Sequence, residues 1–146
     1  MLEGGDGIDT VSYEYSNDAV AVDLGAGNGS GGDAEGDTLS GIEAVVGSDY
    51  GDTLSGSAGA DTLSGGAGDD RLQGGDGRDQ LEGGAGNDTL TGGAGADVFV
   101  ADGTADRITD FDTTTGISGN GTDDNDFIDL TQFYNPTTLA AWNAAN

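Results

Sequence analysis

The chain has 146 residues, a length typical of a single domain. Its 28 acidic residues against 3 basic ones give a formal net charge of -25, which disfavours DNA, RNA and anionic membranes as direct partners because like charges repel. The absence of cysteine excludes disulfides and thiolate metal sites, and the absence of histidine removes the commonest general base. Low hydrophobicity with high net charge is typical of a disordered chain, so only a regular pattern can argue for a fold.

Such a pattern, G-G-x-G-x-D-x-U-x with U apolar, begins near the N-terminus. The first unit starts at Gly4. Two early units keep the aspartate and the apolar residue, namely Asp9 with Val11 and Asp18 with Val20. A glycine-rich insertion, LGAGNGSGG, then breaks the phase, and the pattern resumes near Gly32 with Asp37 and Leu39 before a second break ahead of Gly47. The opening residues lack the basic and apolar regions of a signal peptide, and no stretch is suited to membrane insertion.

From Gly47 to Phe99 the unit repeats without interruption. The units begin at Gly47, Gly56, Gly65, Gly74, Gly83 and Gly92. Their aspartates are Asp52, Asp61, Asp70, Asp79, Asp88 and Asp97. Their apolar residues are Leu54, Leu63, Leu72, Leu81, Leu90 and Phe99. The next unit, from Ala101, still has Asp106 and Ile108, so the regular region is predicted to extend over residues 47–109 and the irregular, inserted region over 13–46.

Residues 113–146 are predicted to form a C-terminal capping segment with a loop, a short strand and a short helix. The expected strands carry Ile108 with Phe111 and Ile128 with Leu130. The acids around the loop either bind a further ion or are solvated; they are Asp110, Asp112, Asp123, Asp124, Asp126 and Asp129. The last residues, NPTTLAAWNAAN, predict a helix capped by Asn135, which we favour as a plug on the repeats over a partner-binding helix.

Each unit predicts a tight glycine turn followed by a short strand. Short units at a constant period indicate an all-β solenoid, and two units per coil would stack residues that lie eighteen apart. One of its two sheets would then contain Leu54, Leu72, Leu90 and Ile108, and the facing sheet would contain Leu63, Leu81 and Phe99. Residues 1–112 are therefore predicted to form one solenoid domain.

The stacked aspartates predict a bound cation. Adjacent strands bring two carboxylates to about 5 Å, where they repel by about 3 kcal/mol at an effective dielectric constant near 20. A divalent cation between the turns reverses the sign of this interaction. The turns offer carbonyl and carboxylate oxygens in an adaptable cage, which suits Ca²⁺ better than Mg²⁺.

The units resemble the RTX, or hemolysin-type calcium-binding, repeats of secreted bacterial proteins from Gly4 to about Asp112. The resemblance implies a parallel β-roll that folds on binding several Ca²⁺ ions. It also implies an extracellular location and export by type I secretion machinery. The chain would be a monomeric module of a larger protein.

In that family an ion lies between turns one coil apart, so the resemblance assigns two sets of ligands to each site. The first turn supplies its second and fourth carbonyls and its aspartate, and the later turn its first and third carbonyls and its aspartate. The assigned pairs are Ser48, Tyr50 and Asp52 with Gly65, Ala67 and Asp70; Ser57, Gly59 and Asp61 with Gly74, Asp76 and Asp79; Gly66, Gly68 and Asp70 with Gly83, Ala85 and Asp88; Gly75, Gly77 and Asp79 with Gly92, Ala94 and Asp97; and Gly84, Gly86 and Asp88 with Ala101, Gly103 and Asp106. Two further expected sites join Asp33, Glu35 and Asp37 to Gly47, Asp49 and Asp52, and involve Asp9 near Gly5 and Gly7.

The leading hypothesis is a calcium-responsive folding module without enzymatic activity. Paired carboxylates can hydrolyse glycosides, but every aspartate in register already has a structural role, and no nucleophile or base stands out. The alternative is an adhesin-like or other surface-binding segment of a secreted protein. An ice-binding surface would need an uninterrupted row of outward threonines. The corresponding row here is interrupted by other residues: Thr53, Thr62, Arg71, Gln80, Thr89 and Val98.

Overall fold

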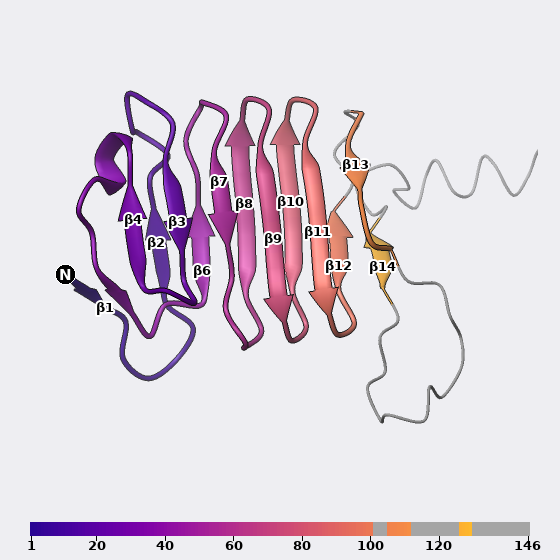
Figure 1. Cartoon of the computed structure of the whole chain (residues 1–146), viewed down its shortest axis with the longest axis horizontal. Coiled ribbons are helices and arrows are strands. Elements are labelled where there is room, and N and C mark those ends of the chain that lie inside the picture. The colour runs from indigo at the N-terminus through magenta and orange to yellow at the C-terminus, as the bar shows by residue number, and fades with distance from the viewer. Residues whose placement is uncertain (101–104, 112–125, 130–146) are drawn as a thin grey trace, which may run out of the picture.

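A computed structural model of the chain describes residues 1–100, 105–111 and 126–129. These residues form two long sheets that face each other across a thin core (Figure 1). The first sheet contains β2 (Thr10–Ser12), β6 (Ala44–Val46), β8 (Thr62–Ala67), β10 (Gln80–Ala85), β12 (Val98–Val100) and β14 (Phe127–Asp129). The second sheet contains β4 (Asn28–Ser30), β3 (Ala21–Asp23), β7 (Thr53–Ser55), β9 (Arg71–Asp76), β11 (Thr89–Ala94) and β13 (Arg107–Ile108). A small pair, β1 (Leu2–Glu3) with β5 (Leu39–Ser40), and the 3-10 helix η1 (Gly32–Ala34) lie at the N-terminal end.

The chain alternates between the two sheets, so each coil contains one strand of each. Consecutive coils are in parallel register: β8 pairs with β10 through Leu63 and Leu81, and β9 pairs with β11 through Leu72 and Leu90. Each of these partners is eighteen residues from the other, as two nonapeptides per coil require. The parallel β-roll expected from the sequence is therefore confirmed, and so are the two predicted columns of apolar residues.

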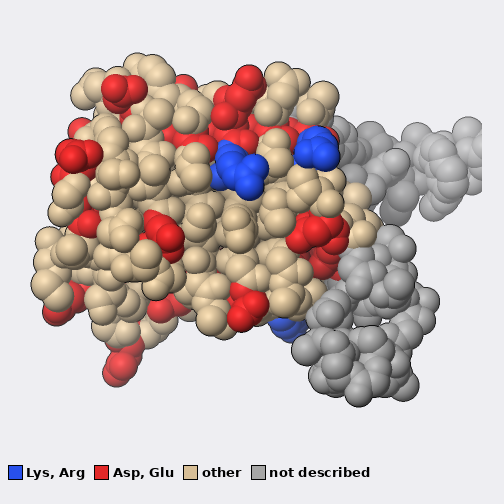
Figure 2. All heavy atoms as spheres, in the orientation of Figure 1, with Lys and Arg blue, Asp and Glu red and all other residues tan. Residues whose placement is uncertain are grey.

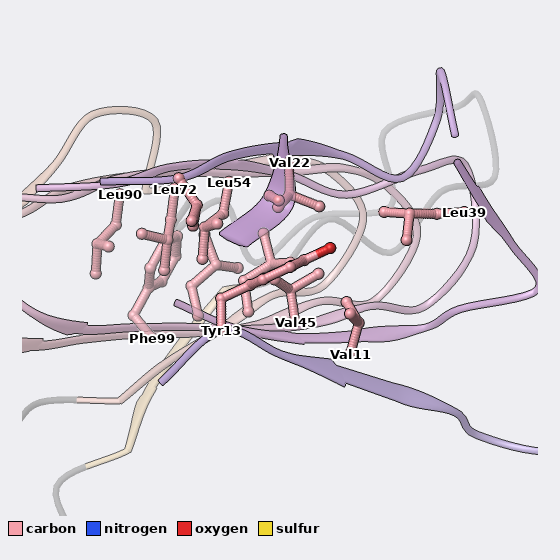
Figure 3. Close-up of a cluster of buried hydrophobic side chains, with 13 residues drawn as sticks. Val11, Tyr13, Val22, Leu39, Val45, Leu54, Leu72, Leu90 and Phe99 are labelled. Carbon is pink, nitrogen blue, oxygen red and sulfur yellow. The ribbon is translucent and has the colours of Figure 1, made fainter. Parts of the chain in front are cut away.

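The core is a single layer of side chains between the sheets. Leu54, Leu63, Leu72 and Leu81 are each 0% exposed, so the one apolar residue of every unit is completely enclosed. Figure 3 shows Leu54, Leu72 and Leu90 extending from one sheet toward Phe99 and others of the facing sheet. Because each coil contributes so little apolar area, the turns must supply part of the stability.

The N-terminal coil departs from the predicted spacing. The register places Val22 opposite Leu54 in the apolar column, and Val20, the expected apolar residue of its unit, is buried as well. The segment after β3 does not begin a new coil. It forms the antiparallel strand β4 and η1, and it returns to the roll only at β6. The insertion thus extends one turn of the solenoid.

At the C-terminal end the structure describes β13 and β14. Ile108 packs on the core, as does Phe111, whose ring centroid lies 6.0 Å from that of Phe99. The strand predicted around Ile128 is β14, which pairs with β12. Leu130 and the predicted capping helix lie outside the described residues, and the domain boundary at residue 112 stays a prediction. Within the described part, no helix is long and apolar enough to cross a membrane.

Candidate metal centres

The glycine turns gather along the two long edges of the roll, called here the upper and lower edges as seen in Figure 1. The upper edge contains the turns 47–52, 65–70 and 83–88, and the lower edge contains the turns 56–61, 74–79 and 92–97. Each turn ends in the aspartate of its unit. The repeat aspartates therefore form two columns, one along each edge.

Every repeat aspartate in these turns is buried, between 0% and 3% exposed. In Asp70, Asp79, Asp88 and Asp97 one carboxylate oxygen, Oδ1, accepts a hydrogen bond from the backbone N–H of the aspartate one coil earlier. The donor-to-acceptor distances are 2.7 Å from Asp52 to Asp70, 2.9 Å from Asp61 to Asp79, 2.8 Å from Asp70 to Asp88, and 2.9 Å from Asp79 to Asp97. This bond orients each carboxylate along the stack and joins successive coils.

The second carboxylate oxygen is the unusual one. The Oδ2 atoms of Asp70 and Asp79 are buried and have no hydrogen-bond partner. Each lies against the first glycine of its own turn, where a Cβ on Gly65 or Gly74 would meet it. Because a buried charged oxygen without a partner is costly, these atoms indicate that the fold provides for a ligand there.

The pKa values of these carboxyls reflect the same cost. Burial raises the pKa of Asp70 to about 7, the charges of Asp52 and Asp88 add to the rise, and the N–H donated by Asp52 opposes it. Burial likewise raises the pKa of Asp79 to about 7. The columns therefore resist carrying their full negative charge at neutral pH without a compensating cation.

The backbone carbonyls of the turns line the same edges. In the units that begin at Gly65 and Gly74 the second glycine has a positive φ, +107° at Gly66 and +114° at Gly75. A Cβ on either residue would meet the carbonyl oxygen of the residue one coil earlier, Ser48 or Ser57. The carbonyl of Ser48 accepts an N–H from Ala67 at 3.1 Å. A carbonyl has two lone pairs, so one such bond leaves it able to bind a cation.

The structure brings together the turns that the repeat pattern paired. Their inter-turn contacts include Asp76 N–H to Ser57 O at 3.1 Å, Gly68 N–H to Ala85 O at 2.8 Å, Gly77 N–H to Ala94 O at 2.7 Å, and Asp88 N–H to Asp106 Oδ1 at 3.2 Å. The coordination assigned to each oxygen stays a prediction. Ala101 and Gly103 lie outside the described residues.

One expected pairing is corrected by the structure. Asp33, Glu35 and Asp37 were expected to face Asp52, but the Oδ1 atom of Asp52 accepts the N–H of Val20 at 2.7 Å. Asp37 instead accepts the Tyr13 hydroxyl at 2.9 Å. The position of the insertion explains the difference. Because the insertion follows β3, which pairs with β7, the inserted acids lie at a different turn from Asp52.

The repeat pattern did not place two acidic residues in the columns: Glu43 was missed, and Asp126 was expected only among the acids around the C-terminal loop. The register aligns Glu43 with Asp61, and Asp126 Oδ1 accepts the N–H of Asp97 at 3.1 Å. Glu43 lies nine residues before Asp52, so counting backwards from the regular units would have found it. Asp126 follows a long segment between two strands, and no periodic signal marks it.

The donor set fits Ca²⁺. Among the described residues no group of three or more acidic side chains is close enough to hold a metal, so a site must combine carboxylates with backbone carbonyls. Flexible cages of hard oxygen ligands suit Ca²⁺. On the face in Figure 2, acidic side chains are spread widely, whereas basic ones form a few isolated spots, which further favours cation binding.

Comparison with known families agrees with this geometry. Residues 46–81 and 73–108 match the family model of the RTX calcium-binding nonapeptide repeat (4 copies). The matched residues include the regular turns of both edges. RTX repeats bind Ca²⁺, and the two columns of buried aspartates fit calcium-binding sites.

Proposed function

The chain carries RTX calcium-binding nonapeptide repeats, and from this premise we propose that it is a calcium-dependent folding module of an exported protein. One observation carries the proposal: both edges contain columns of buried aspartates, and at Asp70 and Asp79 one carboxylate oxygen has no hydrogen-bond partner. Such columns favour the folded state only when a cation offsets their repulsion. Calcium thereby becomes part of the folding equilibrium.

The location follows from the calcium concentration that such sites need. Extracellular calcium modules bind with dissociation constants of about 10⁻⁴–10⁻³ M, so their sites are empty inside a cell and filled outside it. With a net charge of -25, the calcium-free chain would stay soluble through self-repulsion. We therefore infer that the chain passes through a type I secretion channel unfolded and folds on release.

The proposal includes no catalytic role. RTX repeats are a structural calcium-binding module, and the buried repeat aspartates hold the coils together through their Oδ1 atoms. Their carboxylates are thus committed to the fold rather than to a substrate. The module would serve the folding and secretion of whatever domains share its chain.

Circular dichroism in chelator and in calcium tests the proposal. In chelator at neutral pH the whole chain should give the spectrum of an unfolded polypeptide, and millimolar Ca²⁺ should produce β-sheet signal. Mg²⁺ at the same concentration should do much less, because it requires stricter octahedral geometry. Full β structure in chelator would contradict the proposal.

A further inference from the structure

The lower edge continues beyond the regular units toward the N-terminus, and Glu43 occupies the position of the next repeat aspartate. Ala44 pairs with Thr62, and the N–H of Thr62 donates to the carbonyl of Glu43 at 2.8 Å. The regular coils make the same bond, for example from Arg71 N–H to Asp52 O at 2.9 Å. Glu43 therefore stands in register with the aspartate column, one coil before Asp61.

The Glu43 side chain makes the contact that a repeat aspartate makes. Its Oε2 atom accepts the backbone N–H of Asp9 at 3.1 Å, just as Asp70 Oδ1 accepts the N–H of Asp52 at 2.7 Å. The strands on either side agree, since Thr10 pairs with Ala44. Asp9 and Glu43 are thus related as two successive repeat aspartates are, although 34 residues separate them.

The Gly4–Asp9 turn also has the conformation of the regular turns. Gly5 and Gly7 have φ of +102° and +130°, close to the +107° and +110° of Gly66 and Gly68. A Cβ on Gly4 would meet the carbonyl oxygen of Gly41, as a Cβ on Gly47 would meet that of Gly65. A backbone oxygen therefore lies across this turn as it does across the regular ones.

Two carboxylate oxygens beside Glu43 have no hydrogen-bond partner. Asp9 Oδ2 is buried without one, as Asp70 Oδ2 is. Asp61 is 2% exposed, and its Oδ1 atom also lacks a partner. In the regular coils Oδ1 accepts the N–H of the acid one coil earlier, but the N–H of Glu43 donates instead to Asp9 O at 3.1 Å. Asp61, which the register places one coil from Glu43, thus keeps one buried oxygen without a hydrogen bond, although its Oδ2 atom accepts the N–H of Ser57 at 2.6 Å.

We propose that Glu43 is a calcium ligand that, with Asp9 and the Gly41 carbonyl, forms an additional site joining the N-terminal turn to the lower edge. The inference rests on the proposed function, because it extends the same column of ions. The ion would neutralise Asp9 and Glu43 and lessen the field at Asp61. The long insertion between β3 and β6 makes this site possible, because it brings the chain back to the roll at Glu43, beside Asp9.

Glu43→Gln tests the site, because glutamine keeps an oxygen acceptor for the Asp9 N–H and removes only the charge. Native mass spectrometry of the whole chain at saturating Ca²⁺ should count a single ion fewer than in the wild type. Hydrogen exchange in calcium should accelerate on the order of tenfold at Thr10–Ser12, because local opening becomes easier, and stay unchanged at β9 and β11. Glu43→Asp, which restores the repeat residue, should keep the ion.

Glu82→Gln is the matched control, since Glu82 lies on β10 outside the turns, and it should bind the wild-type number of ions. A wild-type ion count and wild-type exchange in Glu43→Gln would overturn the inference while leaving the proposed function intact. A wild-type chain that binds no Ca²⁺ would overturn the proposed function as well. If Glu43→Gln prevents folding altogether, Asp9→Asn at the terminal turn decides: loss of one ion supports the site, and an unchanged count refutes it.

Discussion

Asp70 and Asp79 each perform two tasks with their two carboxylate oxygens. In Asp79, Oδ1 accepts the N–H of Asp61, whereas Oδ2 has no hydrogen-bond partner. The first oxygen stabilises the stack whatever the solution contains. The second makes the stack unfavourable unless a cation binds there. The sign of one residue's contribution to stability therefore depends on calcium.

Asp79→Asn should separate these two tasks. The amide oxygen can still accept the Asp61 N–H, but a charged ligand is lost, so the calcium midpoint of folding should rise by about tenfold or more. In calcium-free buffer the variant should be more stable than the wild type, because repulsion from Asp61 and Asp97 is removed. Calcium titrations followed by circular dichroism measure both effects. Asp18→Asn, at an exposed residue of the inserted region, is the control, and equal midpoints for the two variants would refute the assignment.

The raised pKa values predict that acid favours the calcium-free roll. Asp70 and Asp79 have pKa values of about 7 in the fold against the ordinary 3.8, so the folded state binds more protons than the unfolded state between these values. Their contribution to stability is greatest below about pH 4 and is lost as the pH rises through 7. Calcium-free β signal should thus be larger at pH 4 than at pH 8. A signal that grows from pH 4 to pH 8 would contradict this sign.

At the scale of the turn, the glycines have different roles. The second glycine of a unit adopts a positive φ and lies against a carbonyl of the preceding coil, as Gly75 does against Ser57. Gly59, by contrast, has no positive φ, and an added Cβ would meet only the Ser57 Oγ atom at 3.6 Å. The equivalent fourth-position glycine has a positive φ in the next units, +110° at Gly68 and +126° at Gly77, so the need for glycine depends on the unit as well as on the position.

Gly75→Ala and Gly59→Ala test this difference within one edge. Alanine at Gly75 would suffer the left-handed backbone cost of about 1–2 kcal/mol and a clash with the Ser57 carbonyl, so its calcium-bound roll should unfold at a clearly lower temperature. Alanine at Gly59 should change the unfolding temperature little. Thermal unfolding in saturating Ca²⁺ measures both, and equal losses would mean that the turn geometry is not what requires glycine.

The regular coils could be predicted from the sequence because each unit specifies its own turn and its own core residue. Leu54 and Leu72 lie opposite each other, as the eighteen-residue spacing predicted. The insertion could not be placed, because the length of a loop does not reveal where the chain rejoins the stack. The places of Val22 in the core column and of Glu43 in the aspartate column therefore become visible only in the strand register. The motif glycines reveal the regular turns in the sequence. A residue that replaces a motif residue, as Glu43 replaces a repeat aspartate, is identified only by the register of the neighbouring strands.

At the scale of the whole molecule, the roll is a one-dimensional stack in which each coil contacts only its neighbours. Its aspartates couple those neighbours: Asp70 accepts the N–H of Asp52 and donates its own N–H to Asp88. A turn ordered by one ion thus presents half of the next site already formed. Folding and ion binding should be cooperative for this reason, even though no single coil has a large core.

A calcium titration of the whole chain should accordingly be sigmoidal, with a midpoint of about 10⁻⁴–10⁻³ M. Each bound ion stabilises the fold by RT ln(1 + [L]/Kd), and the stacked sites add their contributions, so a modest affinity per site suffices to fold the roll over a narrow range of calcium. Asp70→Asn, in the middle of the upper edge, should broaden the transition, because it separates the Asp52 turn from the Asp88 turn. Asp106→Asn, at the end of that column, should broaden it less. Circular dichroism with calorimetric ion counting measures the curves. Hyperbolic binding, or saturation at sub-micromolar free calcium, would contradict the proposal that calcium controls where the chain folds.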